Sequence, residues 1–254
     1  MRVSALAIYP VKGGAATALD AGDMDALGLA GDRRYCLARP GGRAFTQRDE
    51  AALARLRVAL AGTRLTLVFD GDTLAVDPGD FSAAAQVHVW GRAAAVRLAS
   101  HAVNAALTRW FGTPLQLARL EQPVRREAAV LAFGDAAALL VANSASLDAL
   151  NAQLEAPVPM NRFRPNIVVS GGAAFAEDGW ARLRIGAADL VRVHDCGRCE
   201  VTTIDQEFGA VLGSEPLATL ARTRLRGGEP VFGVRYCVER PGRVRVGDPV
   251  EAFA

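Results

Sequence analysis

Two cysteines separated by two residues are the side chains in this chain best suited to carry chemistry. Cys196 and Cys199 form a C-x-x-C motif, and apolar runs at 190–193 and 201–204 flank it. Such runs are typical of strands, so we expect Cys199 to be held rigidly just before a strand at 201–204. A thiolate is a soft metal ligand, and Arg198 beside Cys199 would favour the ionised sulfur. The motif therefore indicates a metal or a sulfur-bearing cofactor at Cys199.

Three other interpretations of the motif stay open. A structural zinc site needs four ligands, whereas the remaining cysteines and histidines are scattered along the chain at Cys36, His88, His101, His194 and Cys237. A thioredoxin-type dithiol needs its first cysteine at a helix N-terminus, whereas strands are expected here. An inert buried pair is the third interpretation, because free cysteine is among the most often buried residues.

Cations near predicted strand ends could bind an anionic group. Lys12 is the single lysine among the 29 basic residues of the chain, and its ammonium is not interchangeable with a guanidinium. Arg33 follows Asp32 close to another predicted strand, and Arg164 precedes Pro165. Proline favours an extended conformation in the residue before it, which would aim the Arg164 side chain in a set direction. If a barrel brings the three cations together, they could grip one phosphate.

The composition is that of an ordinary globular protein. Of 254 residues, 51% are hydrophobic and 22% are charged, and the net charge is +2. This balance gives no reason to expect a nucleic-acid partner, and no run of about 18 apolar residues predicts a membrane span. The first residues are typical of a strand and not of a signal peptide. Four cysteines do not make a disulfide framework, so we expect a cytoplasmic location.

Short strands dominate the pattern of the chain. Apolar runs bounded by turn residues predict strands at 3–8, 33–38, 43–47, 58–68, 73–76, 87–90, 115–120, 139–142, 167–170, 183–185, 190–193, 201–204, 231–238 and 244–250. Helical spacing predicts short helices at 101–111, 147–154 and 214–222, and Ser144 is expected to open the second of them. The chain has neither a βαβ rhythm nor a G-x-G-x-x-G fingerprint. We therefore predict a barrel-like α+β fold that is mostly β, with domains at 1–85 and 86–254.

Longer motifs give the chain a resemblance to a known family. The runs FRPNIVVSG, AFAEDGW, CGRCEVTTID, EPLATL and RVRVGDPVE in the second half resemble the molybdenum cofactor sulfurase C-terminal (MOSC) domain. The runs YPVKG, GLAGDRRYCLA and FTQRDEAALARL in the first half resemble the N-terminal β-barrel domain that accompanies it. The pattern is similar to that of the mitochondrial amidoxime-reducing component and its bacterial counterparts, and it covers nearly the whole chain.

The resemblance implies a molybdenum cofactor, Mo-molybdopterin, held between two β-barrel domains. It implies that Cys199 is the catalytic residue and ligates the molybdenum. The residues expected to bind the cofactor are Lys12, Arg33, Asp135, Arg164, Asn166, Arg198 and Arg235. Some positions depart from the family pattern, because glycine replaces a common serine at Gly13 and Gly197 and alanines follow Asp135. Arg235 stands where tyrosine or asparagine is common. These departures bear on substrate identity and on cofactor affinity.

The activity that the resemblance implies is the reduction of N-hydroxylated small molecules such as amidoximes. Electrons would come from a separate flavoprotein, haem protein or iron–sulfur protein, because the sequence has no cysteine-rich extension before its end at Ala254. The alternative is a carrier that binds cofactor or sulfur at Cys199 and hands it on without turnover. Neither a nucleic acid nor a membrane is an expected partner.

Overall fold

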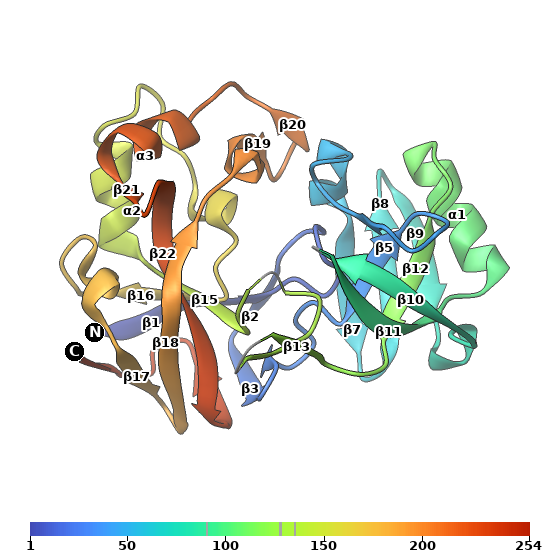
Figure 1. Ribbon diagram of the computed structural model, residues 1–254, viewed down its shortest axis with the longest axis horizontal. Helices are drawn as coiled ribbons and strands as arrows, with labels where there is room; N and C mark the ends of the chain where they lie inside the picture. The colour runs from blue at the N-terminus through green and yellow to red at the C-terminus, as the bar shows by residue number, and fades with distance from the viewer. Residues whose placement is uncertain (90, 127–128, 135) are drawn as a thin grey trace.

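The computed structural model describes residues 1–254 except 90, 127, 128 and 135, and it has two bodies side by side (Figure 1). The larger body is built on a curled nine-stranded sheet of order β2-β1-β16-β15-β22-β18-β17-β24, with β21 paired to β22. Its strands are β1 (Arg2–Ile8), β2 (Thr17–Leu19), β15 (Leu139–Asn143), β16 (Ile167–Ser170), β17 (Arg182–Ile185), β18 (Ala188–Gly197), β21 (Leu225–Arg226), β22 (Glu229–Arg240) and β24 (Val250–Phe253). The fold is mostly β, as predicted.

The smaller body contains a five-stranded sheet of order β10-β11-β12-β5-β6 and a three-stranded sheet of order β7-β8-β9. The strands are β5 (Tyr35–Ala38), β6 (Ala44–Phe45), β7 (Arg57–Ala61), β8 (Arg64–Phe69), β9 (Asp72–Val76), β10 (Ala83–Val89), β11 (Arg92–Leu98) and β12 (Gln116–Leu120). Helix α1 (His101–Phe111) closes this body, because Val103 and Leu107 are buried in one apolar cluster with Leu67 of β8 and Leu117 of β12.

The remaining elements are short. Helices α2 (Ser144–Asn151) and α3 (Leu217–Thr223) contact the larger sheet at β16 and β22. The small strands are β3 (Ala21–Asp25), β4 (Gly28–Leu29), β13 (Val124–Arg126), β14 (Ala129–Leu131), β19 (Ile204–Asp205), β20 (Ala210–Val211) and β23 (Gly242–Arg245). The 3-10 helices are η1 (Ala51–Arg55), η2 (Pro78–Asp80), η3 (Met160–Phe163), η4 (Ala176–Gly179) and η5 (Glu200–Thr203).

The first strand of the chain belongs to the larger sheet. β1 pairs antiparallel with β16, with Leu6 opposite Ile167. Val3, Leu6 and Ile8 are buried in the apolar core of the larger body, and each such side chain contributes about 1.5–3 kcal/mol by its burial. The segment after β1 then crosses to the smaller body, where Lys12 donates its backbone N–H to the carbonyl of Tyr35 at 2.8 Å. Residues 9–12 therefore lie at the junction of the two bodies.

Most predicted elements are present, with shifted ends. Helix α2 begins at Ser144, the residue expected to open it, and the Asn143 side chain caps the helix by accepting the N–H of Ala145. It ends at Asn151, before the predicted end at 154. The predicted strand 244–250 is divided into β23 and β24 by a turn that contains Gly247 at φ 92°. The predicted division between 85 and 86 falls within β10 and stays a prediction. No helix in the described part of the chain is long and apolar enough to cross a membrane. The expected cytoplasmic location stays a prediction.

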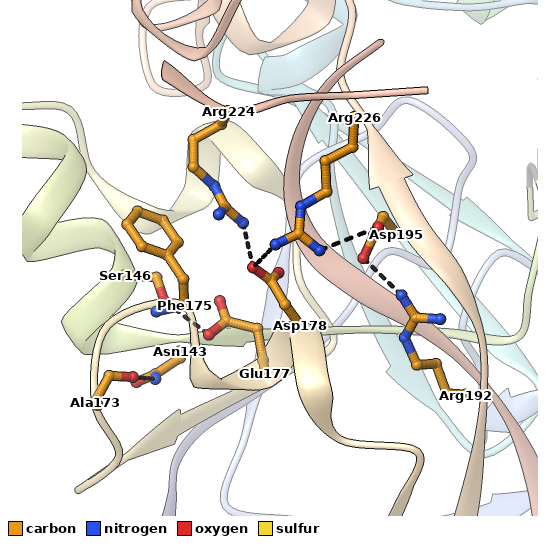
Figure 2. A network of polar contacts seen from close by, with 10 residues as sticks. All are labelled: Asn143, Ser146, Ala173, Phe175, Glu177, Asp178, Arg192, Asp195, Arg224 and Arg226. Atoms are coloured by element: carbon orange, nitrogen blue, oxygen red, sulfur yellow. Dashed lines mark hydrogen bonds and ion pairs between the residues drawn. The ribbon is translucent and has the colours of Figure 1, made fainter. Parts of the chain in front are cut away.

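A polar network braces the strand that leads to the C-x-x-C motif (Figure 2). Asp178, in η4, accepts hydrogen bonds from Arg224 at 2.6 Å and from Arg226 at 2.8 Å. Arg226 also pairs with Asp195 of β18 at 3.6 Å. Arg192 donates to the other carboxylate oxygen of Asp195 at 2.8 Å. Because Asp195 lies one residue before the first cysteine of the motif, the network fixes the end of β18 against η4 and β21.

Candidate functional site

A cavity of about 360 Å³, here called the central cavity, is lined by residues from both halves of the chain. Its volume lies in the range usual for small-molecule sites. The predicted site residues among its lining are Lys12, Arg33, Arg164, Asn166, Arg198, Cys199 and Arg235. The remaining predicted residue, Asp135, lies outside the described residues. Six of the described lining residues are cations, and one, Glu229, is a carboxylate. The structure therefore brings the predicted thiol and the predicted cations to one place.

Cys199 is positioned by a helical turn. The predicted strand at 201–204 is wrong, because Glu200–Thr203 form η5 with Cys199 as its N-cap residue. The Thr202 hydroxyl donates to the Cys199 carbonyl at 2.9 Å, and the Thr203 hydroxyl donates to the Glu200 carbonyl at 2.7 Å. Such local hydrogen bonds compete with a strand ladder and outweigh the strand preference of threonine. The half-buried Cys199 thiol thus lies between the end of β18 and a 3-10 turn.

The arginine that contacts the Cys199 sulfur is Arg48. Its Nη2 donates to Cys199 Sγ at 2.9 Å, and its Nε donates to Glu200 Oε1 at 2.5 Å. Arg198 instead donates from Nη1 to Cys196 Sγ at 2.9 Å. The expectation that Arg198 acts on the Cys199 sulfur is therefore wrong, because its side chain turns back to the preceding cysteine. The charge next to Cys199 comes from the other half of the chain.

The cysteines differ in their surroundings. All four are free thiols, and no group of three or more His, Cys, Asp or Glu side chains in the described residues could hold a metal ion. A zinc site of the usual ligand number is therefore not supported within that part of the chain. Cys196 is fully buried, whereas Cys199 lines the central cavity. Burial raises the pKa of the Cys36 thiol to about 12, which makes it unreactive. Cys199 is the thiol placed to meet a ligand in the central cavity.

The guanidinium groups of two predicted arginines lie over the aromatic ring of Tyr9. The guanidinium carbon lies 4.2 Å from the Tyr9 ring centre for Arg164 and 4.6 Å for Arg33. The Tyr9 hydroxyl donates to the Pro165 carbonyl at 3.1 Å. Burial raises the pKa of Tyr9 to about 12, although Arg164 opposes the rise. The ring is therefore neutral at physiological pH, and its face attracts both cations.

Arg164 does not have the extended backbone that Pro165 led us to expect. Its φ of 55° and ψ of 46° are left-handed, and it is the C-cap residue of η3. A conformation of this kind costs about 1–3 kcal/mol in a residue other than glycine. The Arg164 guanidinium donates to the side-chain oxygen of Gln206 and to the Gly14 carbonyl, both at 2.8 Å. These tertiary contacts and the ring contact offset the local preference.

Asn166 ties three segments together. It is 1% exposed, and its Oδ1 accepts from the Leu140 N–H at 3.1 Å and from Arg33 Nη1 at 3.3 Å. Its Nδ2 donates to the Ala7 carbonyl at 3.1 Å. Arg33 also pairs with the buried Asp32 at 2.5 Å. These contacts give Asn166 a positioning role for Arg33, and its own contact with a cofactor stays a prediction.

Three further cations complete the wall of the central cavity. Lys12 is 8% exposed, and its Nζ donates to the Phe133 carbonyl at 3.0 Å. Arg235 of β22 is half-buried, and its side chain has no hydrogen bond or ion pair with any other described residue. The Nε of Arg198 is buried and has no partner in the described part of the chain. The side-chain donors of Arg235 are therefore available to a bound group.

The sequence reasoning missed Tyr9, Arg48, Gln47 and Gln206. Gln47 and Gln206 exchange side-chain hydrogen bonds at 3.0 and 3.1 Å, which join the two halves of the chain at the cavity. Gln47 Nε2 also donates to the Gly13 carbonyl at 2.7 Å. Three of these residues could have been found from the motifs in the sequence. Tyr9 belongs to YPVKG, and Gln47 and Arg48 belong to FTQRDE.

Comparison with known proteins decides the family. The family model described as MOSC domain matches residues 128–251, and the one described as MOSC N-terminal beta barrel domain matches residues 1–114. The chain belongs to the MOSC domain family. Mitochondrial amidoxime-reducing component 1 of Xenopus laevis is 33% identical over 98% of this chain and 81% of its own length. The human component 1 is 32% identical, and component 2 of Bos taurus is 31% identical, each over 98% of this chain and 82% of its own length.

Two glycines of this MOSC protein suit the packing around the cavity. Gly13 has a φ of 82°, and a Cβ at this position would lie 2.7 Å from Leu53 Cδ2. A Cβ at Gly197 would overlap the Glu229 carboxylate at Oε2. A serine at Gly13 would therefore be strained by its backbone as well as by its neighbour, and a serine at Gly197 would displace the Glu229 carboxylate. The departures from the family pattern noted above thus have local structural reasons.

Proposed function

We propose that the chain is a molybdenum-cofactor-dependent reductase of N-hydroxylated small molecules that receives electrons from a separate protein. The observation that carries the proposal is the position of Cys199, a half-buried thiol in a cavity that has six cations among its described lining residues. The relatives are named amidoxime-reducing components, and an amidoxime is an N-hydroxylated compound. The electron donor would be a flavoprotein, a haem protein or an iron–sulfur protein.

The chemistry of the central cavity fits a group that combines a soft metal with an anionic phosphate. A thiolate is a soft metal ligand, and arginine forks match the geometry of a phosphate. Six cations against one carboxylate among the described lining residues favour negative charge in the cavity. Arg235 lines the cavity and has no side-chain partner among the described residues, so its donors can bind an anionic group. The cavity therefore has the donors and the charge that a molybdopterin requires.

The residues have separate roles in this proposal. Cys199 ligates the molybdenum, and the residues that bind the pterin and its phosphate are Lys12, Arg33, Asp135, Arg164, Arg198 and Arg235, with Asn166 beside them. Tyr9 and Asn166 hold two of the arginines before the cofactor arrives, which lowers the ordering cost of binding. When bound, the cofactor supplies the two-electron oxygen-transfer chemistry, and the protein orients it.

The net reaction balances with two electrons and two protons. For an amidoxime, R–C(NH₂)=N–OH + 2 e⁻ + 2 H⁺ gives R–C(NH₂)=NH + H₂O. The N–O bond breaks, the nitrogen is reduced, and the oxygen leaves as water. The donor protein supplies both electrons, and solvent supplies the protons.

A turnover assay with a matched variant tests the proposal. Purified protein loaded with Mo-molybdopterin is mixed with benzamidoxime and an artificial reductant, and benzamidine is measured. We expect turnover by the wild type and none by Cys199→Ser. Cys237→Ser is the control, because Cys237 is also a free, half-buried cysteine, and it lies in β22 outside the central cavity. A protein that binds the cofactor but forms no benzamidine would be a carrier, and the reductase proposal would be wrong.

A further inference from the structure

A second cavity of about 390 Å³, here called the side cavity, adjoins the central cavity. The two cavities share Lys12, Thr46 and Arg48 among their lining residues. The other described lining residues of the side cavity belong to the smaller body and are Arg43, Ala44, Asp49, His88 and Val89. The central cavity is assigned above to the cofactor, whereas the side cavity has no role in that assignment.

The Arg48 side chain connects the side cavity to the sulfur of Cys199. Arg48 donates to Cys199 Sγ at 2.9 Å and also lines the side cavity. A small molecule with its N-hydroxyl group near Cys199 could therefore place its remaining atoms beside Arg48 in the side cavity. Both cavities are of the size usual for small-molecule sites.

The side cavity is positively charged. Its described cations are Lys12, Arg43 and Arg48, and its one described carboxylate is Asp49. Asp49 is already engaged, because it accepts from Arg43 Nη2 at 2.5 Å and from the Thr46 N–H at 3.0 Å. Burial raises the pKa of Asp49, but the hydrogen bonds from Arg43 and Thr46 outweigh it and hold the pKa below its usual range. With Asp49 ionised, the described lining residues carry two positive charges in excess, and one of these, on Arg48, is paired with Glu200 outside the lining.

The side cavity also has an apolar part. Ala44 is 7% exposed and Val89 is 9% exposed, and both contribute to its lining. A ring or a short carbon chain could lie against these side chains while its end group meets the cations. Arginine binds a carboxylate through two parallel N–H donors, so a carboxylate on a small carbon framework matches this lining.

Building on the reductase function proposed above, we propose that the side cavity binds the substituent of the substrate. The substrate class is then an N-hydroxylated compound that carries a carboxylate on that substituent. Arg43 is the residue that selects this class, because it lines the side cavity and not the central cavity. Electrostatic complementarity of this kind determines which substrates bind well.

Two substrates that differ in a single carboxylate test the inference. The loaded protein is assayed with benzamidoxime and with 4-carboxybenzamidoxime under the same artificial reductant, and the ratio of the two kcat/KM values is measured. We expect the carboxylated compound to have at least about a tenfold higher kcat/KM, as for one good charge-assisted contact. Arg43→Glu is expected to lower the ratio at least about tenfold by the same reasoning. Arg43→Gln removes the positive charge without adding a negative charge beside Asp49, so it is expected to lower the ratio less than Arg43→Glu does.

Arg64→Glu is the matched control. Arg64 is another exposed arginine of the smaller body, it pairs with Asp77 at 3.1 Å, and it lines neither cavity. Its variant is expected to leave the ratio unchanged. Binding of the reaction product 4-carboxybenzamidine, followed by calorimetry, should be tighter than that of benzamidine and should weaken in Arg43→Gln.

The outcomes separate the inference from the function on which it rests. If both compounds are reduced with equal kcat/KM, or if the Arg43 variants leave the ratio unchanged, the inference is overturned and the reductase function stands. If the loaded protein reduces neither compound, the reductase function fails and the inference fails with it.

Discussion

Replacement of Arg48 by methionine should weaken cofactor retention far more than it weakens the fold. The change removes the donor that lies 2.9 Å from Cys199 Sγ and the ion pair with Glu200. A hydrogen bond to a charged partner contributes about 1.5–3 kcal/mol, and loss of a partner of a metal ligand typically lowers metal affinity about 10–100-fold. The Arg48 side chain is 33% exposed, and solvent screening moves the expected effect toward the lower value. We therefore expect about a tenfold faster loss of cofactor.

The fold itself should be little affected by this change. The Glu200 side chain is 60% exposed, and an exposed ion pair contributes about 0–1 kcal/mol to the free energy of unfolding. The two quantities are measured separately. Molybdenum content after timed dialysis gives cofactor retention, and urea denaturation of the cofactor-free protein gives the free energy of unfolding.

Two further variants make the comparison specific. Glu200→Gln removes the ion pair but keeps Arg48, and it should retain most of the molybdenum. Arg43→Met removes a neighbouring arginine that pairs with Asp49 at 2.5 Å and does not line the central cavity. Equal retention by Arg48→Met and wild type, or equal loss from Arg48→Met and Arg43→Met, would refute the role given to the contact with Cys199.

Three other changes give separate tests. Tyr9→Phe should lower the free energy of unfolding, measured by urea denaturation, by about 1 kcal/mol and should keep the molybdenum. Tyr9→Leu removes the ring contacts of Arg33 and Arg164 and should lower the molybdenum content. Equal molybdenum contents in the two variants would contradict this. Lys12→Arg should also lower the molybdenum content, and an unchanged content would show that a guanidinium suffices there. Burial raises the pKa of Glu177, so wild-type stability should fall, relative to Glu177→Gln, as pH rises from about 4 to about 8; a difference in free energy of unfolding that is constant with pH would contradict this.

The sign of the Glu177 effect follows from the direction of the shift. Its raised pKa means that the folded protein binds the proton more tightly than the unfolded chain does. The associated stability is fully present below the unfolded pKa and is lost as pH rises through the folded pKa. Glutamine has no such titration and can still accept the Ser146 hydroxyl, which lies 2.8 Å from Glu177 Oε2.

The strand pattern could be read from the sequence, because apolar runs and turn residues act locally. The 3-10 helix at Glu200–Thr203 could not be read in this way, because the hydroxyls of Thr202 and Thr203 form hydrogen bonds with nearby carbonyls that periodicity does not register. The left-handed Arg164 also opposes a local rule, since tertiary contacts to Gln206 and Tyr9 set its conformation.

The identity of the site residues was easier to predict than their pairing. The motifs located the cations and the thiol that line the central cavity. The contact between Arg48 and Cys199 joins residues 151 positions apart, and only the folded chain determines such a contact. For the same reason, nothing in the sequence indicated that Arg198 turns to Cys196.

The molybdenum content of two single-cysteine variants tests the central claim most directly. Cys199→Ser and Cys196→Ser are purified with the wild type under identical conditions, and the molybdenum bound per chain is measured by mass spectrometry. Thermal melting of each cofactor-free protein establishes that both variants fold. We predict that Cys199→Ser loses the molybdenum and that Cys196→Ser retains most of it. Equal loss from both variants, or full molybdenum in Cys199→Ser, would contradict the assignment of the Cys199 sulfur as the metal ligand.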